Sequence, residues 1–331
     1  MSSVNYQPRK VLVTGGAGFI GSHFIRYALG QDPNLIIVNL DLLTYAGSLK
    51  NLENLPDEKR HVFVKGDICD KLLVEKILHE YNIDTIVHFA AESHVDRSIE
   101  GPAPFIQTNV VGTFTLLEAA RKAKLSRFHH ISTDEVYGSL TPDAPAFTEQ
   151  SPYAPNSPYS ASKASSDHLV RAYYHTYQLP ITMSHCSNNY GAYQHPEKFI
   201  PTVIRSCLKK QPIPIYGDGS NVRDWIYVED HSRGIMDILT KGRLGETYHL
   251  GGQCEISNLQ MAQMICKLMD ESCLKLIHFV KDRAGHDWRY AMDISKIYQE
   301  LNWQPAESLC EGLRETIQFY ANAKELEHES H

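Results

Sequence analysis

The sequence lacks the features that mark several large classes of protein. No run of basic residues occurs and the net charge is −7, so neither nucleic acid nor an anionic membrane is expected as the main partner. No apolar stretch approaches the roughly 18 residues of a membrane-spanning helix, and residues 1–9 contain no apolar signal-peptide segment. The seven cysteines form no C-x-x-C pair, which predicts reduced thiols and a cytoplasmic protein. The 17 histidines include no H-x-x-x-H or H-E-x-x-H pattern, so no metal site is expected.

What the chain has is an alternation of short apolar runs and amphipathic helices. With 331 residues, of which 42% are hydrophobic, it can bury the core of one large or two medium domains. Strand-like runs are expected at 10–13, 36–40, 61–65, 85–89 and 128–131, and helices at 19–29, 72–81, 105–123 and 159–177. This alternation is typical of an α/β protein with a parallel sheet covered on both faces. Right-handed crossovers then give a doubly wound, Rossmann-type fold.

The alternation stops near residue 188. The residues that follow are rich in Pro, Gly and Asn, which predicts loops until helix and strand return near 228–240 and 247–250. We therefore expect a Rossmann-type domain over residues 1–189, with return segments near 226–252. A smaller C-terminal lobe, mainly residues 190–331, would bind the substrate.

A dinucleotide site is predicted at the end of the first strand. Gly15, Gly18 and Gly21 follow it in a G-x-x-G-x-x-G spacing, which permits a tight turn, close approach of a pyrophosphate and close packing of the next helix. Asp41 ends the second strand, where its carboxylate would bind ribose hydroxyls and repel a 2′-phosphate. The pair of signals favours NAD over NADP. The alternative is a glycine-rich turn in some other α/β protein.

Further candidate contacts follow the third and fourth strands. Asp67 and Ile68 close the third strand, where an adenine would lie, and the small Ala90 and Ala91 would let the chain pass beneath the cofactor. His94 is either a ligand contact or a satisfied loop histidine, and the residues alone leave both open.

Acid and base groups gather after the fifth predicted strand. Thr133, Asp134 and Glu135 lie at its carboxyl end, where open α/β sheets bind ligands, although an isolated Asp-Glu pair is more often a solvated turn. Tyr159 and Lys163 are four residues apart on one predicted helix and therefore share a face. The ammonium group, with a nicotinamide cation, is expected to lower the tyrosine pKa towards neutrality. A phenolate there can take the proton of an alcohol as the hydride leaves.

The order of these motifs resembles the extended short-chain dehydrogenase/reductase family, and within it the branch that dehydrates dTDP-glucose. The match covers nearly the whole chain, at residues 14–21, 41, 44–46, 67–68, 90–98, 132–138, 157–167, 186–191, 196–198, 216–219, 222–225 and 282–290. Relatives that only epimerise usually lack the Asp-Glu pair.

The resemblance implies a mechanism and a role for each residue of the centre. Tyr159 would remove the C4 hydroxyl proton while NAD takes the C4 hydride, and Thr133 would hydrogen-bond the C4 oxygen. Glu135 would take the C5 proton and Asp134, as the neutral acid, would protonate the departing C6 hydroxyl. Return of the hydride to C6 would leave a 4-keto-6-deoxy sugar.

The resemblance also implies the remaining contacts. Cofactor contacts would be Gly15, Gly18, Phe19, Ile20, Gly21, Asp41, Thr44, Asp67, Ile68, Ala90, Ala91, Thr108, Tyr159, Lys163 and Asn189. Contacts with the nucleotide sugar would be Ser93, His94, Thr133, Asn188, Glu197, Lys198, Pro214, Tyr216, Arg223, Asn258, His286 and Tyr290. Lys198 and Arg223 would face the diphosphate, and a surface position is the alternative for either base. Departures from the family pattern at His185, Ala192, His195, Gln253, Cys254 and Ala284 lie near the substrate pocket, so thymidine against uridine stays open.

Other functions remain possible from the sequence. A UDP-sugar 4,6-dehydratase and a nucleotide-sugar 4-epimerase share the fold, and a non-catalytic NAD-binding protein is a third possibility. The apolar stripes of helices 105–123 and 159–177 fit core packing. The resemblance further implies that these helices pair two subunits in a four-helix bundle, giving a homodimer.

Overall fold

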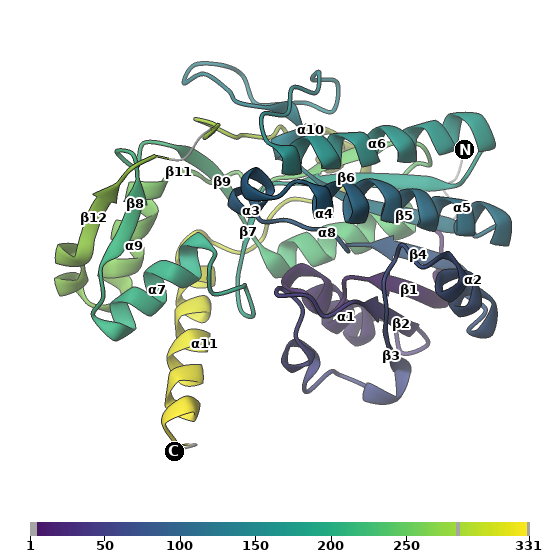
Figure 1. The fold of residues 1–331 in the computed structure, drawn as a ribbon, viewed down its shortest axis with the longest axis horizontal. Helices are drawn as coiled ribbons and strands as arrows, with labels where there is room; N and C mark the ends of the chain where they lie inside the picture. The colour runs from purple at the N-terminus through teal and green to yellow at the C-terminus, as the bar shows by residue number, and fades with distance from the viewer. Residues whose placement is uncertain (1–4, 283–284, 330–331) are drawn as a thin grey trace.

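The larger lobe is built on a seven-stranded parallel sheet. The structure is a computed structural model that describes residues 5–282 and 285–329, and Figure 1 shows its two lobes. The strand order is β10-β6-β5-β4-β1-β2-β3, and every pairing in it is parallel. The strands are β1 Lys10–Thr14, β2 Ile36–Asp41, β3 His61–Lys65, β4 Thr85–His88, β5 Arg127–Thr133, β6 Ile181–Cys186 and β10 Thr247–Leu250. The predicted doubly wound fold is confirmed.

Helices cover both faces of this sheet. Successive side chains of a strand point to opposite faces, so each strand contributes to two cores. On β1, Val11 and Val13 belong to one apolar core and Leu12 to the other. The first core lies under α1 (Phe19–Gln31) and α8 (Val228–Lys241), which pack together. The second lies under α2, α5 and α6, and Figure 1 shows α5 and α6 side by side. Their bounds are Lys71–Glu80, Thr113–Ala123 and Pro158–Tyr177.

Two segments from the second half of the chain complete the larger lobe. β10 pairs with β6 at one edge of the sheet, and α8 packs against α1. Helix α10 (Ser295–Leu301) lies against β10. The part of the C-terminal half that packs on the larger lobe therefore includes α10 as well as the expected return segments near 226–252.

The helix predicted at 105–123 is present, but its first half is not an α-helix. Residues Ile106–Gly112 form a π-helical segment, η3, which leads into α5. Within it, the Asn109 side chain accepts a hydrogen bond from Glu92 N at 2.9 Å and donates to Glu92 O at 3.0 Å. Single π turns occur often at functional sites, and here the turn fixes the loop that follows β4. Hydrophobic spacing near 3.6 cannot report such a local widening.

The prediction of loops between residue 188 and the helix near 228 is also wrong. This region contains β7 (Asn188–Tyr190), α7 (Phe199–Lys209), β8 (Ile213–Tyr216) and β9 (Val222–Tyr227). Pro201 lies in the first turn of α7, where a helix needs no backbone N–H from that residue. Counting prolines and glycines therefore underestimated the regular structure of this lobe.

The smaller lobe, at the left of Figure 1, joins these elements to the C-terminal part of the chain. Its sheets have the orders β11-β9-β7 and β12-β8, and an apolar core of its own lies among α7, α9 and α11. The additional elements are β11 Glu255–Ser257, β12 Ile277–Val280, α9 Asn258–Met269 and α11 Leu309–Glu329. Short helices elsewhere are η1 Leu49–Leu52, η2 Glu58–Arg60, α3 Val95–Glu100, α4 Ala103–Phe105, η4 Asp134–Tyr137 and η5 Glu271–Leu276.

Two kinds of feature are absent from the described part of the chain. No helix there is long and apolar enough to cross a bilayer. No three His, Cys, Asp or Glu side chains in residues 5–282 and 285–322 are grouped as metal ligands would be.

Candidate active site

A cleft opens at the carboxyl edge of the large sheet, where β1, β2, β4 and β5 end. It brings together most of the predicted residues: Gly15, Gly18, Phe19, Ile20, Gly21, Asp41, Thr44, Asp67, Ile68, Ala90, Ala91, Ser93, Thr108, Thr133, Asp134, Glu135, Tyr159, Lys163, Asn188, Asn189 and Lys198. The predicted residues His94, Glu197, Pro214, Tyr216, Arg223, Asn258, His286 and Tyr290 are not among its lining residues. One continuous cleft thus joins the glycine-rich turn to the acid and base groups.

The glycine-rich turn is fixed by space as well as by conformation. Gly15 has φ +72°, and a Cβ there would lie 2.6 Å from Ala90 N, so both the backbone and the neighbouring strand exclude a side chain. A Cβ on Gly21 would collide with Gly15 O. Helix α1 begins at Phe19, and its N-cap Gly18 supplies no side-chain cap. The first amides of α1 therefore face the cleft as donors for an anion.

Asp41 is held in place at the end of β2. Its carboxylate accepts hydrogen bonds from Ala17 N at 2.9 Å and from Leu43 N at 2.7 Å. Burial raises the pKa of Asp41, and the two backbone hydrogen bonds act in the opposite direction. The oriented carboxylate lines the cleft, which suits it to accept hydrogen bonds from a pair of ribose hydroxyls.

Asp134 is a buried carboxyl at the end of β5. It is 2% exposed, its Oδ1 accepts a hydrogen bond from Thr133 Oγ1 at 3.3 Å, and its Oδ2 has no hydrogen-bond partner among the described residues. Burial raises the pKa of Asp134 well above its ordinary value, and the nearby carboxylates of Glu135 and Asp224 raise it further. Arg223 lowers it. The neutral acid is therefore the favoured form of Asp134.

Tyr159 and Lys163 lie on the buried face of α6, which begins with a capping box at Ser157. The predicted lowering of the Tyr159 pKa includes the effect of a nicotinamide cation, so it stays a prediction for the protein with its cofactor bound. Burial, then Glu135 and Cys186, raise the pKa of Tyr159 well above its ordinary value, whereas a hydrogen bond with Thr133 lowers it. The Lys163 ammonium donates to Ile131 O at 2.7 Å, so the cation is anchored on the strand beside the tyrosine. A cationic ring in the cleft would be needed to favour the phenolate.

The predicted substrate residues divide into two groups. Lys198 lines the cleft, and its ammonium donates to Ser93 O at 3.1 Å. Arg223 lies in strand β9, not in a loop as predicted, and donates to Asp287 O at 3.0 Å. Its guanidinium carbon lies 4.4 Å from the centre of the Tyr290 ring.

The second group lies further from the acid and base groups. Glu197 accepts hydrogen bonds from Arg97 at 2.9 and 3.0 Å, and the His94 ring lies 3.6 Å from the same carboxylate. Pro214 and Tyr216 lie in β8, Asn258 begins α9, and the His286 ring stands edge-on to that of Tyr216. Arg283 and Ala284, from the matched stretch 282–290, lie outside the described residues.

Sequence reasoning missed two buried carboxylates near the cleft. Asp167 accepts a hydrogen bond from Ser132 Oγ at 2.8 Å and lies between His130 and His185. Asp224 accepts from Cys254 N and Gly252 N, and burial raises its pKa to about 6. Asp167 stands four residues after Lys163 on the same helix, and that spacing was the available signal. Asp224 had no comparable signal.

The family described as GDP-mannose 4,6 dehydratase matches residues 12–316. The chain belongs to this family. The dTDP-glucose 4,6-dehydratase of Haemophilus influenzae is 52% identical, over 94% of this chain and 97% of its own. That of Escherichia coli is 50% identical, over 96% of this chain and 94% of its own. The resemblance inferred from the motifs is confirmed.

Solved structures extend the comparison to the fold. The dTDP-glucose 4,6-dehydratase of Streptomyces venezuelae, solved with NAD bound, has a TM-score of 0.92 at 47% identity and covers 96% of this chain and 98% of that one. A UDP-glucose 4-epimerase from Thermotoga maritima has a TM-score of 0.88 at 27% identity and covers 95% and 99%. The shared fold therefore includes proteins that are named for different reactions.

The raised pKa of Asp134 predicts a pH-dependent cost to stability. A carboxyl whose pKa is raised by folding destabilises the folded state most at high pH. There the buried group must either ionise or keep a proton that the unfolded chain would release, and both cost free energy. Asp134→Asn should therefore raise the free energy of unfolding at pH 8, with a gain that vanishes near pH 4, about the pKa of an unfolded aspartate. Urea unfolding between pH 4 and 8 measures this. Asp143→Asn, at an exposed position, serves as control, and an equal gain at every pH for Asp134→Asn would contradict the prediction.

Proposed function

We propose that the protein is a dTDP-glucose 4,6-dehydratase that acts with bound NAD. The observation that carries the proposal is the continuous cleft in which Thr133, Asp134 and Glu135 face the same space as Tyr159 and Lys163. An alcohol oxidation needs a base such as Tyr159. It needs no further pair of carboxyls, whereas an elimination of water needs both an acid and a base. The relatives described above support the same reaction.

The residues present fit NAD. The open N-terminus of α1 suits a pyrophosphate, and the carboxylate of Asp41 suits ribose hydroxyls and disfavours a 2′-phosphate. Gly15 and Ala90 let the two strand ends approach closely beneath the cofactor. NAD supplies, when bound, a hydride acceptor for the sugar C4 and a hydride donor for C6. We assign the cofactor to residues 1–189 with the segments near 226–252, and the nucleotide sugar mainly to residues 190–331.

The side chains of the chain move the protons. Tyr159 takes the proton of the C4 hydroxyl, and Thr133 hydrogen-bonds the C4 oxygen as it becomes a ketone. The ketone acidifies the C5 hydrogen, which Glu135 removes as a carboxylate. Asp134 delivers its proton to the C6 hydroxyl, which leaves as water. Glu135 exchanges that proton with solvent and then protonates C5 when C6 is reduced.

The cycle leaves one internal imbalance. Tyr159 ends with a proton that it did not have, and Asp134 ends without the proton it gave. The Thr133 hydroxyl is hydrogen-bonded to Asp134 Oδ1 at 3.3 Å and also contacts Tyr159. It is therefore placed to carry that proton back, so no net proton exchange with solvent is required.

The substrate side supplies positive charge for a diphosphate. Lys198 lines the cleft, and Arg223 lies near Asp134, whose pKa it lowers. Because Arg223 is 5% exposed and held by backbone carbonyls, its guanidinium has a fixed direction. We assign both bases to the diphosphate of the substrate.

A nucleotide-sugar 4-epimerase is the principal rival. The epimerase of Thermotoga maritima shares the fold at a TM-score of 0.88, so architecture does not separate the two reactions. The buried Asp134, with its unpaired Oδ2 among the described residues, favours dehydration. An epimerase would gain nothing from a buried neutral acid beside the sugar.

Substrate identity and reaction are tested together. Incubation with dTDP-glucose should give the alkali-induced absorbance of a 4-keto-6-deoxy sugar, and incubation in heavy water should place deuterium at C5. UDP-glucose, run in parallel, should react more slowly. Faster turnover of UDP-glucose would make the protein a UDP-sugar dehydratase, interconversion of C4 epimers would make it an epimerase, and no product from either substrate would overturn the proposal.

The separate roles of acid and base are tested by Asp134→Asn. The substitution should leave the formation of NADH in a single turnover near its original rate, because oxidation does not use Asp134. Loss of water should slow by about 10²- to 10⁴-fold, the usual contribution of a general acid. Stopped-flow absorbance at the NADH band measures both steps. Tyr159→Phe is the matched control and should slow both, whereas an equal loss in both steps for Asp134→Asn would reject the assignment.

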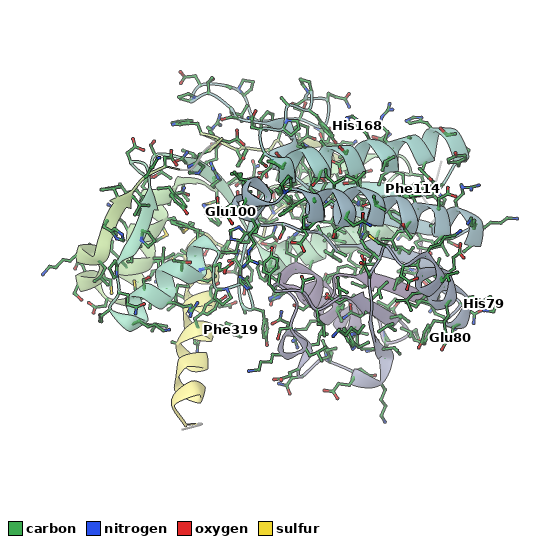
Figure 2. The ribbon with its side chains drawn as sticks, in the orientation of Figure 1. His79, Glu80, Glu100, Phe114, His168 and Phe319 are labelled. Carbon is green, nitrogen blue, oxygen red and sulfur yellow. The ribbon has the colours of Figure 1, made fainter. Side chains whose placement is uncertain are left out.

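We also propose a homodimer formed by α5 and α6 of each subunit in a four-helix bundle. The outer surface of this region exposes large apolar side chains at Ile99, Ile106, Val111, Phe114 and Tyr177, each between 38% and 51% exposed. Phe114, labelled in Figure 2, lies on α5. Large apolar side chains exposed on α5 and the helices beside it fit an interface.

A charge placed in this surface should separate the subunits. Phe114→Glu should reduce the mass measured by size-exclusion chromatography with light scattering from twice that of the chain to once. Phe279→Glu changes an apolar residue that is 58% exposed on β12 of the smaller lobe, and this control should stay dimeric. A wild-type protein that is monomeric at micromolar concentration would contradict the dimer.

The proposed compartment is the cytoplasm. All seven cysteines are free thiols, and Cys207 and Cys266 lie 3.8 Å apart between sulfur atoms without a bond. Neighbouring thiols that remain unpaired fit a reducing environment.

A further inference from the structure

Asp167 is a buried carboxylate that the proposed steps do not use. It lies on α6 and is 1% exposed. Its Oδ2 accepts a hydrogen bond from Ser132 Oγ at 2.8 Å. The Nε2 atoms of His130 and His185 each lie 3.2 Å from one of its oxygens. Burial acts to raise the pKa of Asp167, but His130 and His185 hold it well below its ordinary value, so the buried group is a carboxylate. A buried carboxylate is costly unless it is paired and hydrogen-bonded, which raises the question of what it does there.

Asp167 and Lys163 reach the same strand from the same helix. They are four residues apart on α6 and both are buried. The Lys163 ammonium donates to Ile131 O at 2.7 Å, and Asp167 accepts from the side chain of Ser132, the next residue of β5. The two charges therefore meet the strand at adjacent residues, one turn of helix apart.

Other titratable groups surround Lys163 and Asp167 on every neighbouring element. They are His88 on β4, His130 on β5, Asp134, Glu135 and Tyr137 on η4, Tyr153 in the loop before α6, Tyr159 on α6, His185 and Cys186 on β6, and His249 on β10. Burial, followed by Lys163, lowers the pKa of His130 to about 4, so His130 is neutral near pH 7. The Tyr137 hydroxyl bridges His185 Nδ1 and His249 Nε2 at 2.6 and 2.8 Å.

We propose that Asp167 is the counter-ion that keeps Lys163 cationic, and that it acts as a positioning residue for the active site. Burial lowers the pKa of Lys163, and Asp167 is the largest influence that raises it. Because Ser132 directly precedes Thr133, Asp134 and Glu135, the same carboxylate anchors the strand end that carries the acid and base. The catalytic part of this inference rests on the proposed function. The pairing of the two charges is independent of that function.

The pairing is tested by a double-mutant cycle of stability at two pH values. An unpaired buried ammonium destabilises the fold until pH approaches the pKa of about 10.4 that lysine has in the unfolded chain. The urea midpoint of Asp167→Asn, compared with the parent, should therefore be lower at pH 7 than at pH 9. In a Lys163→Met background, the effect of Asp167→Asn should be the same at both pH values, which identifies Lys163 as the titrating group.

The controls separate charge from packing. Ser166→Ala removes a buried hydroxyl on the same helix, bonded to Lys163 O, and should lower the midpoint equally at pH 7 and 9. If Asp167→Asn does not fold at pH 7, the double variant, which buries no charge at this position, should fold. The proposal would be overturned if the single and the double variant both failed to fold at pH 7. It would also be overturned if the loss in urea midpoint of Asp167→Asn did not change with pH, or if that change with pH persisted in the Lys163→Met background.

The catalytic consequence is read from the pH profile of kcat. Loss of the counter-ion should move the basic limb of the profile to lower pH by about one unit or more, and Asp167→Glu should restore it. A purely structural role would lower kcat by the same factor at every pH and overturn the positioning role. Absence of dehydratase activity in the parent would instead reject the proposed function, and the stability cycle would still decide the pairing.

Discussion

The site depends on the burial of one carboxyl at the end of a core strand. Strand β5 lies between β4 and β6 in a sheet covered on both faces, so the chain leaves it at the middle of the carboxyl edge. Asp134 follows it immediately, 2% exposed, with its pKa raised by burial and by Glu135. Two carboxyls in such a place cannot both be charged at little cost. This position therefore favours one neutral and one ionised carboxyl, which is what the proposed acid and base roles require.

The rest of the larger lobe serves to place reactive groups around that point. The turn after β1 and the end of β2 form the cofactor side, and α6 brings Tyr159 and Lys163 to the other side. Strand β5 also carries His129 and His130, and β6 and β10 carry His185 and His249, all fully buried. A parallel sheet buried on both faces usually has apolar strands. Here hydroxyls contact His129, His185 and His249, and the Asp167 carboxylate lies 3.2 Å from His130 and His185.

The comparisons show how little the fold itself specifies. Dehydratases and an epimerase superpose on this chain over nearly its full length. A shared fold therefore does not decide the reaction, which depends on the side chains of the site. In this chain the proposed dehydration rests on the pair Asp134 and Glu135.

The sequence by itself determined the order of elements, the cofactor turn and the chemistry of the centre. The glycine-rich turn was predictable from its spacing, and a Cβ would collide with Ala90 at Gly15 and with Gly15 O at Gly21. The spacing of Tyr159 and Lys163 follows from the period of a helix. Tertiary structure decided what depends on burial and on contacts between distant segments. Hydrophobic spacing could not show the π turn at Ile106–Gly112, because a local widening of the helix leaves that spacing unchanged. Helix α7 was missed for another reason: Ile200, Val203, Ile204 and Cys207 do recur at helical spacing, but the prolines and glycines around them were given more weight. The direction of the Tyr159 pKa, the neutral state favoured for Asp134 and the partners of Asp167 each depend on which groups share a dry interior, and residues remote in the chain meet there only after folding.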